Sequence, residues 1–362
     1  MSLETPLLDL HRSADATLGE YLGTILPTRF GNFAAEYAAL RETVGLFDTN
    51  FRAFFSFTGP DRQRYVNALL TSNVRDLKPG QGVVGLLLNP QGHIMAEVET
   101  FDREESILAS THAMIRERTL STFDKFIIMD DVTIEDLTAV TGTLDLAGPR
   151  TSALLAELGL GNFDELPLLS HREISSEAIP CRVVRRDLAG VPAATLITGR
   201  EHLHDLWTGL AARVRTYGGV PAGLEALNSI RLECGTPWFG HDYDDRQIPH
   251  EAGLEHSRIS YEKGCYTGQE IVERVRSRGH VNRRLTELLF TAAEGPAPGT
   301  KLLLDGSEIG SVTSTAFSPT LGMAIGLGYL RREHSAVGTR MDASGISAEV
   351  ITPPLLAKKT LP

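Results

Sequence analysis

The sequence predicts an α+β fold that ends in a small all-β module, either a barrel or a sandwich. Before about residue 285, helix-type and strand-type patterns alternate without the sustained βαβ repeat of a doubly wound sheet. Two apolar runs flank an Asn-Pro-Gln-Gly turn, which is typical of an antiparallel hairpin. After that point the chain becomes a series of short strands separated by Gly, Pro and Asp.

The elements of the first part follow from local patterns. Segment 52–59 (RAFFSFTG) predicts a strand that ends at a Gly-Pro pair, and segment 61–74 carries Tyr65 and Leu69 at helical spacing. Segment 82–101 predicts two strands around its Asn-Pro-Gln-Gly turn. The same patterns predict helices at 112–129, 150–159 and 201–214, and strands at 181–187 and 194–199.

Composition predicts a cytoplasmic protein. Hydrophobic residues make up 42% of the chain and charged residues 22%, and no apolar run approaches the roughly 18 residues that cross a bilayer. The N-terminus has no basic segment followed by an apolar one, as a secretion signal would have. The three cysteines, Cys181, Cys234 and Cys265, are far apart, which suits a reducing compartment.

The net charge of −11 disfavours nucleic-acid binding by the chain as a whole. One local exception is the run 274–284, which holds five arginines and no acidic residue. Such a run either clamps an anionic group, such as a phosphate or a carboxylate tail, or forms a solvated helix face followed by a basic turn. Charge alone leaves both interpretations open.

Segment 261–270 (YEKGCYTGQE) combines a cysteine, two glycines and a capping motif. Thr267 and Glu270 have the spacing of a capping box, so we predict a helix from about 268 to 277. Cys265 then lies just before a helix N-terminus, where the macrodipole favours a thiolate. The residue types fit an activated thiol or a ligand-contacting turn, and equally a small residue in a glycine turn.

Segment 231–255 is rich in histidine and acidic residues but predicts no metal site. Its spacing matches neither a zinc HExxH motif nor a calcium-binding EF-hand loop, and acidic loops are commonly solvated turns. No local rule pairs Cys265 with a histidine as nucleophile and base. Glu233 lies near the end of a predicted helix with an apolar stripe, a place where a carboxylate is commonly a surface group.

Longer segments resemble a known family. Segment 263–285 (KGCYTGQEIVERVRSRGHVNRRL) resembles the signature of the YgfZ-type folate-binding proteins. Segment 223–254 resembles the core of the glycine-cleavage T-protein (aminomethyltransferase, GcvT-like) superfamily, to which the YgfZ-type proteins belong. YAALRETVGLFD, LLTSNVRDLKPGQG and LLLNPQGHI are similar to further superfamily segments, in the same order. The resemblance extends from roughly residue 27 to residue 350.

The resemblance implies a three-domain, GcvT-like ring around a central folate channel, with a C-terminal β-barrel. It implies a first, discontinuous α+β domain formed by 1–50 and 140–230. A second α+β domain, formed by 51–139 and 231–282, carries the folate-site segments. The barrel covers 283–362.

The resemblance also implies tetrahydrofolate as the cofactor. Glu233 matches the T-protein carboxylate that hydrogen-bonds the pterin ring, a role that suits an acceptor of two parallel N–H bonds. The basic run after the motif suits the glutamyl carboxylates of folate. The residues implied in folate binding are Glu233, Arg231, Lys263, Tyr266, Gln269, Arg274 and Arg276.

Several positions depart from the T-protein pattern. T-proteins carry an Asp-Asp pair, one member of which is the catalytic acid, where this chain has Ala96 and Glu97. A T-protein tyrosine corresponds to Val84, and a Ser-His pair corresponds to Asn50 and Phe51. Aminomethyl transfer needs a group positioned to exchange a proton with the folate nitrogen and the departing amine, and Glu97 is the candidate substitute.

The departures, together with Cys265, favour the YgfZ-type branch. The resulting hypothesis is a tetrahydrofolate-binding protein that assists iron–sulfur cluster assembly or repair in client enzymes, with iron–sulfur client or carrier proteins as partners. The candidate catalytic residues are Cys265 and Glu97. The alternative hypothesis is an aminomethyltransferase of the glycine cleavage system that transfers a one-carbon unit to tetrahydrofolate. A nucleic-acid-associated protein that uses the 274–284 run is a third, disfavoured hypothesis.

Overall fold

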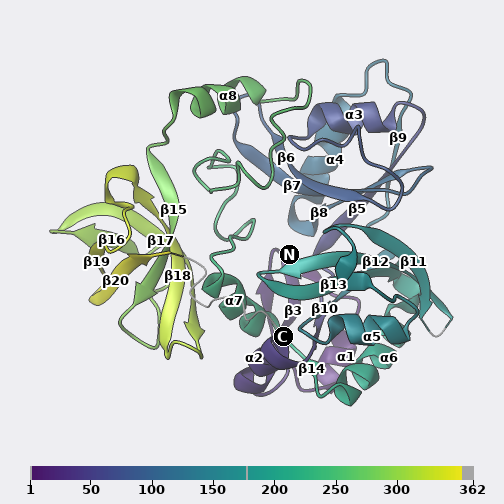
Figure 1. Ribbon diagram of the computed structural model, residues 1–362, viewed down its shortest axis with the longest axis horizontal. Helices are drawn as coiled ribbons and strands as arrows, with labels where there is room; N and C mark the ends of the chain where they lie inside the picture. Colours follow the sequence, from purple (N-terminus) through teal and green to yellow (C-terminus); the bar gives the residue numbers. More distant parts are fainter. Residues whose placement is uncertain (1, 177, 353–362) are drawn as a thin grey trace. The chain divides into compact units, whose positions relative to one another are not determined.

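The computed structural model describes residues 2–176 and 178–352, and the chain divides into two compact units (Figure 1). Each unit is assembled from separated stretches of sequence. The first unit consists of Met1–Leu87, Ala96–Ala226 and Ser260–Thr267. The second unit consists of Leu88–Met95, Leu227–Ile259 and Gly268–Pro362.

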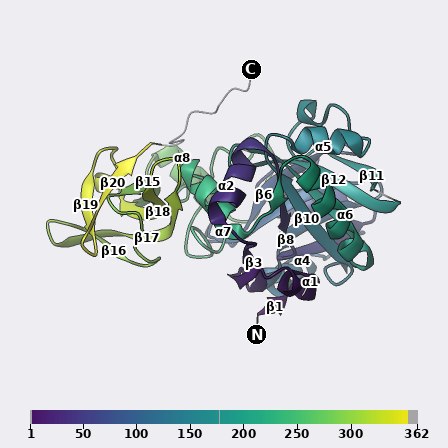
Figure 2. The ribbon, with the colours of Figure 1, turned by 90° about the horizontal axis from the view of Figure 1, so that it is seen from below.

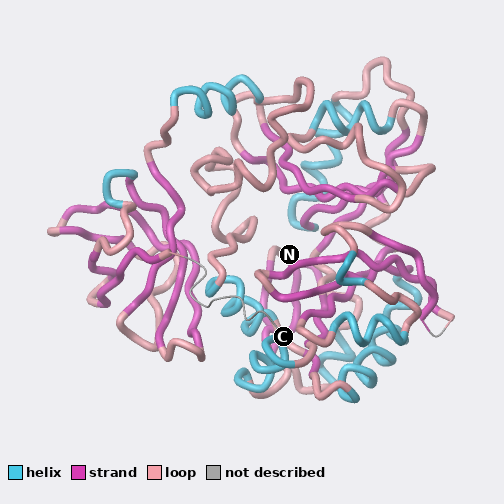
Figure 3. Tube along the Cα trace, viewed as in Figure 1, coloured by secondary structure: helices cyan, strands magenta, loops and turns pink. Residues whose placement is uncertain are grey.

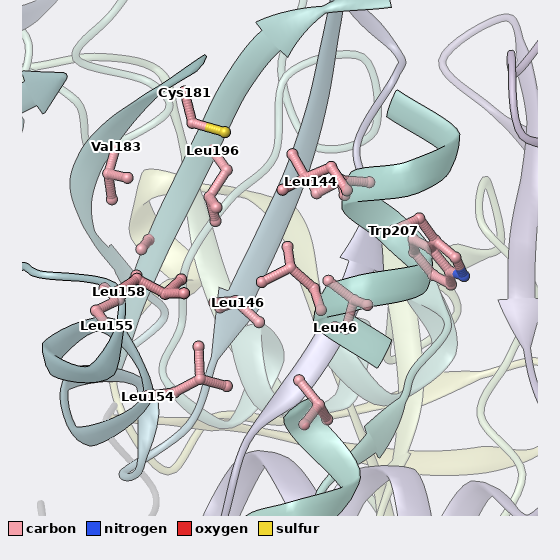
Figure 4. Close-up of a cluster of buried hydrophobic side chains, with 14 of the residues drawn as sticks. Leu46, Leu144, Leu146, Leu154, Leu155, Leu158, Cys181, Val183, Leu196 and Trp207 are labelled. Carbon is pink, nitrogen blue, oxygen red and sulfur yellow. The ribbon is translucent and has the colours of Figure 1, made fainter. Parts of the chain in front are cut away.

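The first unit contains a six-stranded sheet in the order β11-β12-β13-β10-β4-β14. Leucines alternate along β10 and pair with those of its neighbours, Leu144 with Leu196 and Leu146 with Leu46. Helices α5 and α6 cover this face, and Trp207 joins the leucine cluster (Figure 4). The elements are β4 (Gly45–Asp48), β10 (Thr141–Ala147), α5 (Thr151–Glu157), β11 (His171–Ser176), β12 (Ile179–Leu188), β13 (Val191–Gly199), α6 (Leu203–Thr216) and β14 (Val220–Pro221).

A five-stranded sheet follows the order β6-β7-β8-β5-β9. On one face, Phe55 and Phe57 of β5 pack edge-on against Phe123 of α4, at ring-centroid distances of 5.7 and 5.2 Å. On the other face, Phe54 packs with Val184 and other residues of the six-stranded sheet. The elements are β5 (Arg52–Thr58), α3 (Arg62–Leu69), β6 (Gly82–Leu88), β7 (Ile94–Asp102), β8 (Ile107–His112), α4 (Arg116–Lys125) and β9 (Thr133–Asp136).

A three-stranded sheet, in the order β1-β3-β2, lies with two helices at the N-terminal end of the chain. Asn32 caps the second of these helices by accepting a hydrogen bond from the Ala34 N–H at 2.9 Å. The elements are β1 (Leu3–Glu4), α1 (Leu8–Ser13), β2 (Thr17–Tyr21), β3 (Thr24–Arg29) and α2 (Phe33–Glu42).

The second unit contains a closed barrel in the order β15-β18-β17-β16-β19-β20, in which strands are joined by loops and turns (Figure 3). The side view shows the strands curling around a common interior (Figure 2). Inward-facing residues such as Leu288, Phe290 and Leu330 form its core. The elements of this unit are α7 (Leu224–Glu233, from Leu227), α8 (Gln269–Arg278), β15 (Arg283–Phe290), β16 (Lys301–Leu304), β17 (Ser307–Ser318), β18 (Met323–Arg331), β19 (Arg340–Ala343) and β20 (Ile346–Ile351).

The α+β class and the C-terminal barrel predicted from the sequence are confirmed. The hairpin around the Asn-Pro-Gln-Gly turn is also present, as β6 and β7. The three-domain division and the ring around a channel stay predictions. Among the described residues, no helix is both long enough and apolar enough to span a membrane.

Candidate functional site

Strand β7 places Glu97 on a different face from Ala96. Side chains alternate along a strand, so Ile94, Ala96 and Val98 all point to one face and are fully buried. Glu97 points to the opposite face and is half-buried. Its backbone carbonyl accepts a hydrogen bond from Thr111 Oγ1 at 2.7 Å. Of the two positions that correspond to the T-protein Asp-Asp pair, only Glu97 presents an acid.

Glu99, two residues further along the same face, lies in a cluster of three charges. It accepts hydrogen bonds from both terminal nitrogens of Arg186 on β12, one of them at 2.7 Å, and from Arg52 at 3.1 Å. Burial alone would raise the pKa of Glu99, but the charges of Arg186 and Arg52 outweigh it and hold the pKa at about 2. Glu99 therefore stays ionised and joins the five-stranded sheet to the six-stranded sheet.

Arg186 connects this cluster to Glu97. Its Nε donates to Thr195 Oγ1 at 3.0 Å, which fixes the guanidinium plane. Burial would lower the pKa of Arg186, but Glu99 raises it, and the charge of Glu97 contributes in the same direction. Glu97 therefore lies within the electrostatic reach of a buried, permanently charged arginine.

The 260–267 loop is held by Lys263. Its ammonium group is buried and donates to the backbone carbonyls of Asn67, Leu70 and Ser72, which uses all three of its N–H donors. The ammonium also lies 5.3 Å from the centre of the Tyr266 ring. Burial, followed by the charge of Arg75, lowers the pKa of Lys263 to about 8.

Cys265 lies between these two anchored residues and is exposed. Lys263 and Tyr266 are buried on either side of it, so the loop presents the thiol at its surface. Cys181 is buried within the leucine cluster of the first unit. The prediction that Cys265 takes part in catalysis stays a prediction.

The predicted helix after the motif is present as α8, but the predicted capping box is wrong. Gly268 occupies the N-cap position at φ 83°, and no side chain caps the helix. A Cβ at Gly268 would lie 2.6 Å from the Asn89 carbonyl oxygen, so only glycine fits this approach to the β6–β7 turn. At the same turn, a Cβ at Gly92 would lie 2.9 Å from Ile271 of α8. Close packing therefore replaces the hydrogen-bonded cap.

The basic run after the motif is partly neutralised within its own helix. Arg274 pairs with Glu270 at 2.9 Å and Arg276 approaches Glu273 at 3.5 Å, and both arginines are exposed. Gln269, the first residue of α8, is half-buried. The prediction that these residues bind folate stays a prediction.

Glu233, at the end of α7, is fully buried rather than on the surface. Its Oε1 accepts a hydrogen bond from Ser318 Oγ of β17 at 2.5 Å. One residue earlier, Leu232 packs against Ile325 and Leu327 on the outer face of the barrel. The helix end and the barrel wall thus fix the orientation of the carboxylate.

Arg231, on the same helix, belongs to a second buried network. Its guanidinium pairs with Asp242 at 2.6 Å and lies over Trp238, with the Cζ 4.3 Å from the ring centroid. The other carboxylate oxygen of Asp242 accepts from Thr313 and Ser314 of β17, each at 2.6 Å. A buried ion pair with this many hydrogen bonds is a structural anchor. The role of Arg231 in folate binding stays a prediction.

Sequence reasoning missed the role of Asp242. The segment around it has the residue types of a metal loop without the spacing of one, and within 2–176 and 178–352 no group of three or more metal-ligating side chains comes together. The sequence carries no local signal for this pairing, because the two residues are separated by 11 positions of mostly irregular chain. The first unit thus holds Glu97 and the Cys265 loop, and the second unit holds Glu233, Arg231 and α8.

Comparisons with known proteins cover nearly the whole chain. Residues 7–259 match the GCVT N-terminal domain, and residues 283–356 match the glycine cleavage T-protein C-terminal barrel domain. An aminomethyltransferase of Rubrobacter xylanophilus is 30% identical over 329 residues, covering 91% of this chain and 87% of its own. One from Rippkaea orientalis is 29% identical over 350 residues, covering 94% and 92% of the two chains.

A solved structure shares the fold. The glycine cleavage system aminomethyltransferase T of Bartonella henselae superposes with a TM-score of 0.88 at 23% identity, covering 98% of each chain. This likeness and the domain matches confirm the GcvT-like part of the resemblance.

The predicted function in iron–sulfur cluster assembly is wrong. Relatives named aminomethyltransferase match more than nine-tenths of the chain and so favour the alternative hypothesis. No similarity of the chain supports iron–sulfur clients as partners. The prediction depended on one short motif. In the structure Lys263 of this motif holds backbone carbonyls and Gly268 allows a close approach, so structural roles explain both residues.

Proposed function

Because the chain belongs to the glycine cleavage T-protein family, we propose that it is an aminomethyltransferase that transfers a one-carbon unit to tetrahydrofolate. The observation that carries the proposal is the match of both domains, in order, together with aminomethyltransferases that align over more than 90% of the chain. Fold alone would not support an activity, but similarity along the full length of named enzymes does.

Glu233 is the proposed anchor for the pterin ring of tetrahydrofolate. Its carboxylate is buried, and Ser318 holds one oxygen at 2.5 Å. A carboxylate with a fixed orientation accepts two parallel N–H bonds from a 2-amino-pyrimidinone edge better than a mobile one, because less rotamer entropy is lost on binding. The pterin edge presents that donor pair.

Glu97 is the proposed proton-transferring group. Ala96 carries no ionisable group, and Glu99, with its pKa of about 2, holds no proton at neutral pH. Of the acidic side chains on this face of β7, Glu97 is therefore the one suited to exchange a proton with the departing amine or the folate nitrogen during transfer.

The decisive experiment measures how fast the protein transfers the aminomethyl group from a loaded lipoyl carrier protein to tetrahydrofolate. The ammonia released in the reaction provides the readout. Wild-type protein is expected to turn over, and Glu97→Gln is expected to lower kcat by about 10²–10⁴-fold without weakening tetrahydrofolate binding. Glu105→Gln, at an exposed position in the same unit, is the matched control. A folded wild-type protein that binds tetrahydrofolate but shows no transfer contradicts the proposal. Equal kcat values for Glu97→Gln and wild type contradict the role of Glu97 alone.

A further inference from the structure

A cavity of about 350 Å³ lies within the first unit, where the end of the five-stranded sheet meets the six-stranded sheet. Its wall is mostly apolar and is formed by Leu108, Leu137, Val140, Ile174 and Ile197. Two guanidinium groups, of Arg103 and Arg182, also line it. Cavities of this size, with apolar walls and a few convergent polar groups, are typical of small-molecule sites.

Arg103 enters the cavity from the β7–β8 turn without a counter-charge. Arg103 is half-buried, and its Nε is buried without a hydrogen-bond acceptor among residues 2–176 and 178–352. Nothing in the proposed transfer reaction uses this residue. A buried N–H donor without an acceptor is costly, so a ligand acceptor placed in the cavity would satisfy the Nε of Arg103.

Arg182 adds a second positive charge that is only partly compensated. It donates to Glu173, whose side chain is 70% exposed, and to Nδ1 of His171 at 2.6 Å. Burial, followed by the charge of Arg182, lowers the pKa of His171 to about 4, so the imidazole is neutral and contributes no charge. Burial also lowers the pKa of Arg182, and the charge of Arg103 adds to the effect. The cavity therefore holds two guanidinium groups and one largely solvated carboxylate.

From this geometry we infer that the cavity is a second ligand site, which takes a small organic acid. The carboxylate of the ligand accepts hydrogen bonds from Arg103 and displaces the contact of Glu173 with Arg182. The hydrocarbon body of the ligand packs on the leucine and isoleucine wall. The inference does not rest on the proposed function, since none of these residues belongs to the folate or transfer site.

Calorimetric titration of the full chain, without tetrahydrofolate, tests the inference with three probes: 4-methylpentanoate, its neutral amide, and inorganic phosphate. We expect one site for the carboxylate and binding of the amide that is weaker by about tenfold or more, because the amide loses a charged hydrogen bond. Arg103→Gln is expected to weaken binding of the carboxylate by a similar factor. Arg172→Gln, which removes an exposed charge from β11 outside the cavity wall, is expected to leave it unchanged. Glu173→Gln is expected to tighten binding of the carboxylate probe, because the competing carboxylate of Glu173 is gone.

The unliganded proteins provide an independent measurement. Since the Nε of Arg103 has no hydrogen-bond acceptor in the described chain, Arg103→Gln is expected to keep or raise the Tm, whereas a purely structural arginine would make the Tm fall. A wild-type chain that binds no 4-methylpentanoate, binds the amide equally well, or binds phosphate only, overturns the inference. Equal binding by Arg103→Gln and wild type, or weaker binding by Glu173→Gln, overturns it as well.

Discussion

Replacing Glu99 with glutamine removes the negative charge between the five-stranded and six-stranded sheets while keeping the size of the side chain. Arg186 and Arg52 then remain close together, with side chains 6% and 14% exposed, and have lost their shared counter-charge. In the wild type the pKa of Glu99 is about 2 against an ordinary 4.5. That difference, at about 1.4 kcal/mol per pH unit, corresponds to about 3 kcal/mol of folding free energy at neutral pH.

The direction of the pH dependence of stability follows from the lowered pKa of Glu99. A carboxylate whose pKa is lower in the folded state stabilises the fold above its unfolded-state pKa, and loses this contribution as the pH falls from about 4.5 through about 2. Glu99→Gln is therefore expected to be less stable than wild type by about 3–5 kcal/mol at pH 7, because removing one partner leaves two buried cations uncompensated. The difference in unfolding free energy between wild type and Glu99→Gln is expected to narrow as the pH falls, because only the wild type has a carboxylate at position 99 that becomes protonated.

Urea unfolding of the full chain, followed at several pH values between 7 and 2.5, measures this difference. Glu105→Gln is the matched control, because its carboxylate is exposed and carries the same charge. A destabilisation below about 1 kcal/mol at pH 7 would refute the reasoning, because that is the size expected of a surface ion pair. A gap that stays constant with pH would show that shape, rather than charge, makes Glu99 necessary.

Three further predictions concern the remaining anchors. Lys263→Met is expected to lower the free energy of unfolding by about 3 kcal/mol, because three backbone carbonyls lose a charged donor. It is also expected to make the 260–267 loop accessible to limited proteolysis. An unchanged Tm and an unchanged rate of cleavage would contradict this prediction. Gly268→Ala is expected to destabilise the chain by about 1–3 kcal/mol in urea unfolding, because φ is 83° and a Cβ would lie 2.6 Å from the Asn89 oxygen. Ser318→Ala is expected to weaken tetrahydrofolate binding about tenfold in calorimetric titration, because Glu233 loses the donor that orients it; unchanged affinity with an unchanged fold would remove this role.

Local periodicity was enough to place most elements. The alternation along 94–98 puts Ala96 and Glu97 on opposite faces without any tertiary information. The spacing of Thr267 and Glu270 predicted helix α8 to within a residue, as Gln269–Arg278, although the capping box itself is wrong. Short strands bounded by glycines predicted an all-β module, a barrel or a sandwich, and the structure is a closed barrel. In each case the signal lies within about ten residues, the range over which side-chain direction follows backbone geometry.

The roles of the charged residues could not be predicted in this way. Arg186 reaches Glu99 across 87 residues of sequence, and Lys263 reaches the Ser72 carbonyl across 191. Neither pairing produces a periodic pattern in the sequence, because each pairing depends on which faces of separate elements come into contact. Long-range contacts also explain why the function predicted from the Cys265 motif was wrong. The lysine and the glycine of the motif have structural roles that only the folded chain shows.

The amino-acid pattern was enough to establish the α+β class, an all-β C-terminal module, the order of the elements and the likeness to T-proteins, since these depend on local pattern and on long runs of similar residues. Tertiary structure alone decided that Glu99 is locked between two arginines, which leaves Glu97 as the proton-transferring candidate on its face of β7. It also decided that Glu233 is buried against Ser318 and that Arg103 faces a cavity without a counter-charge. The physical reason is that burial and electrostatic environment arise only when distant segments exclude water together.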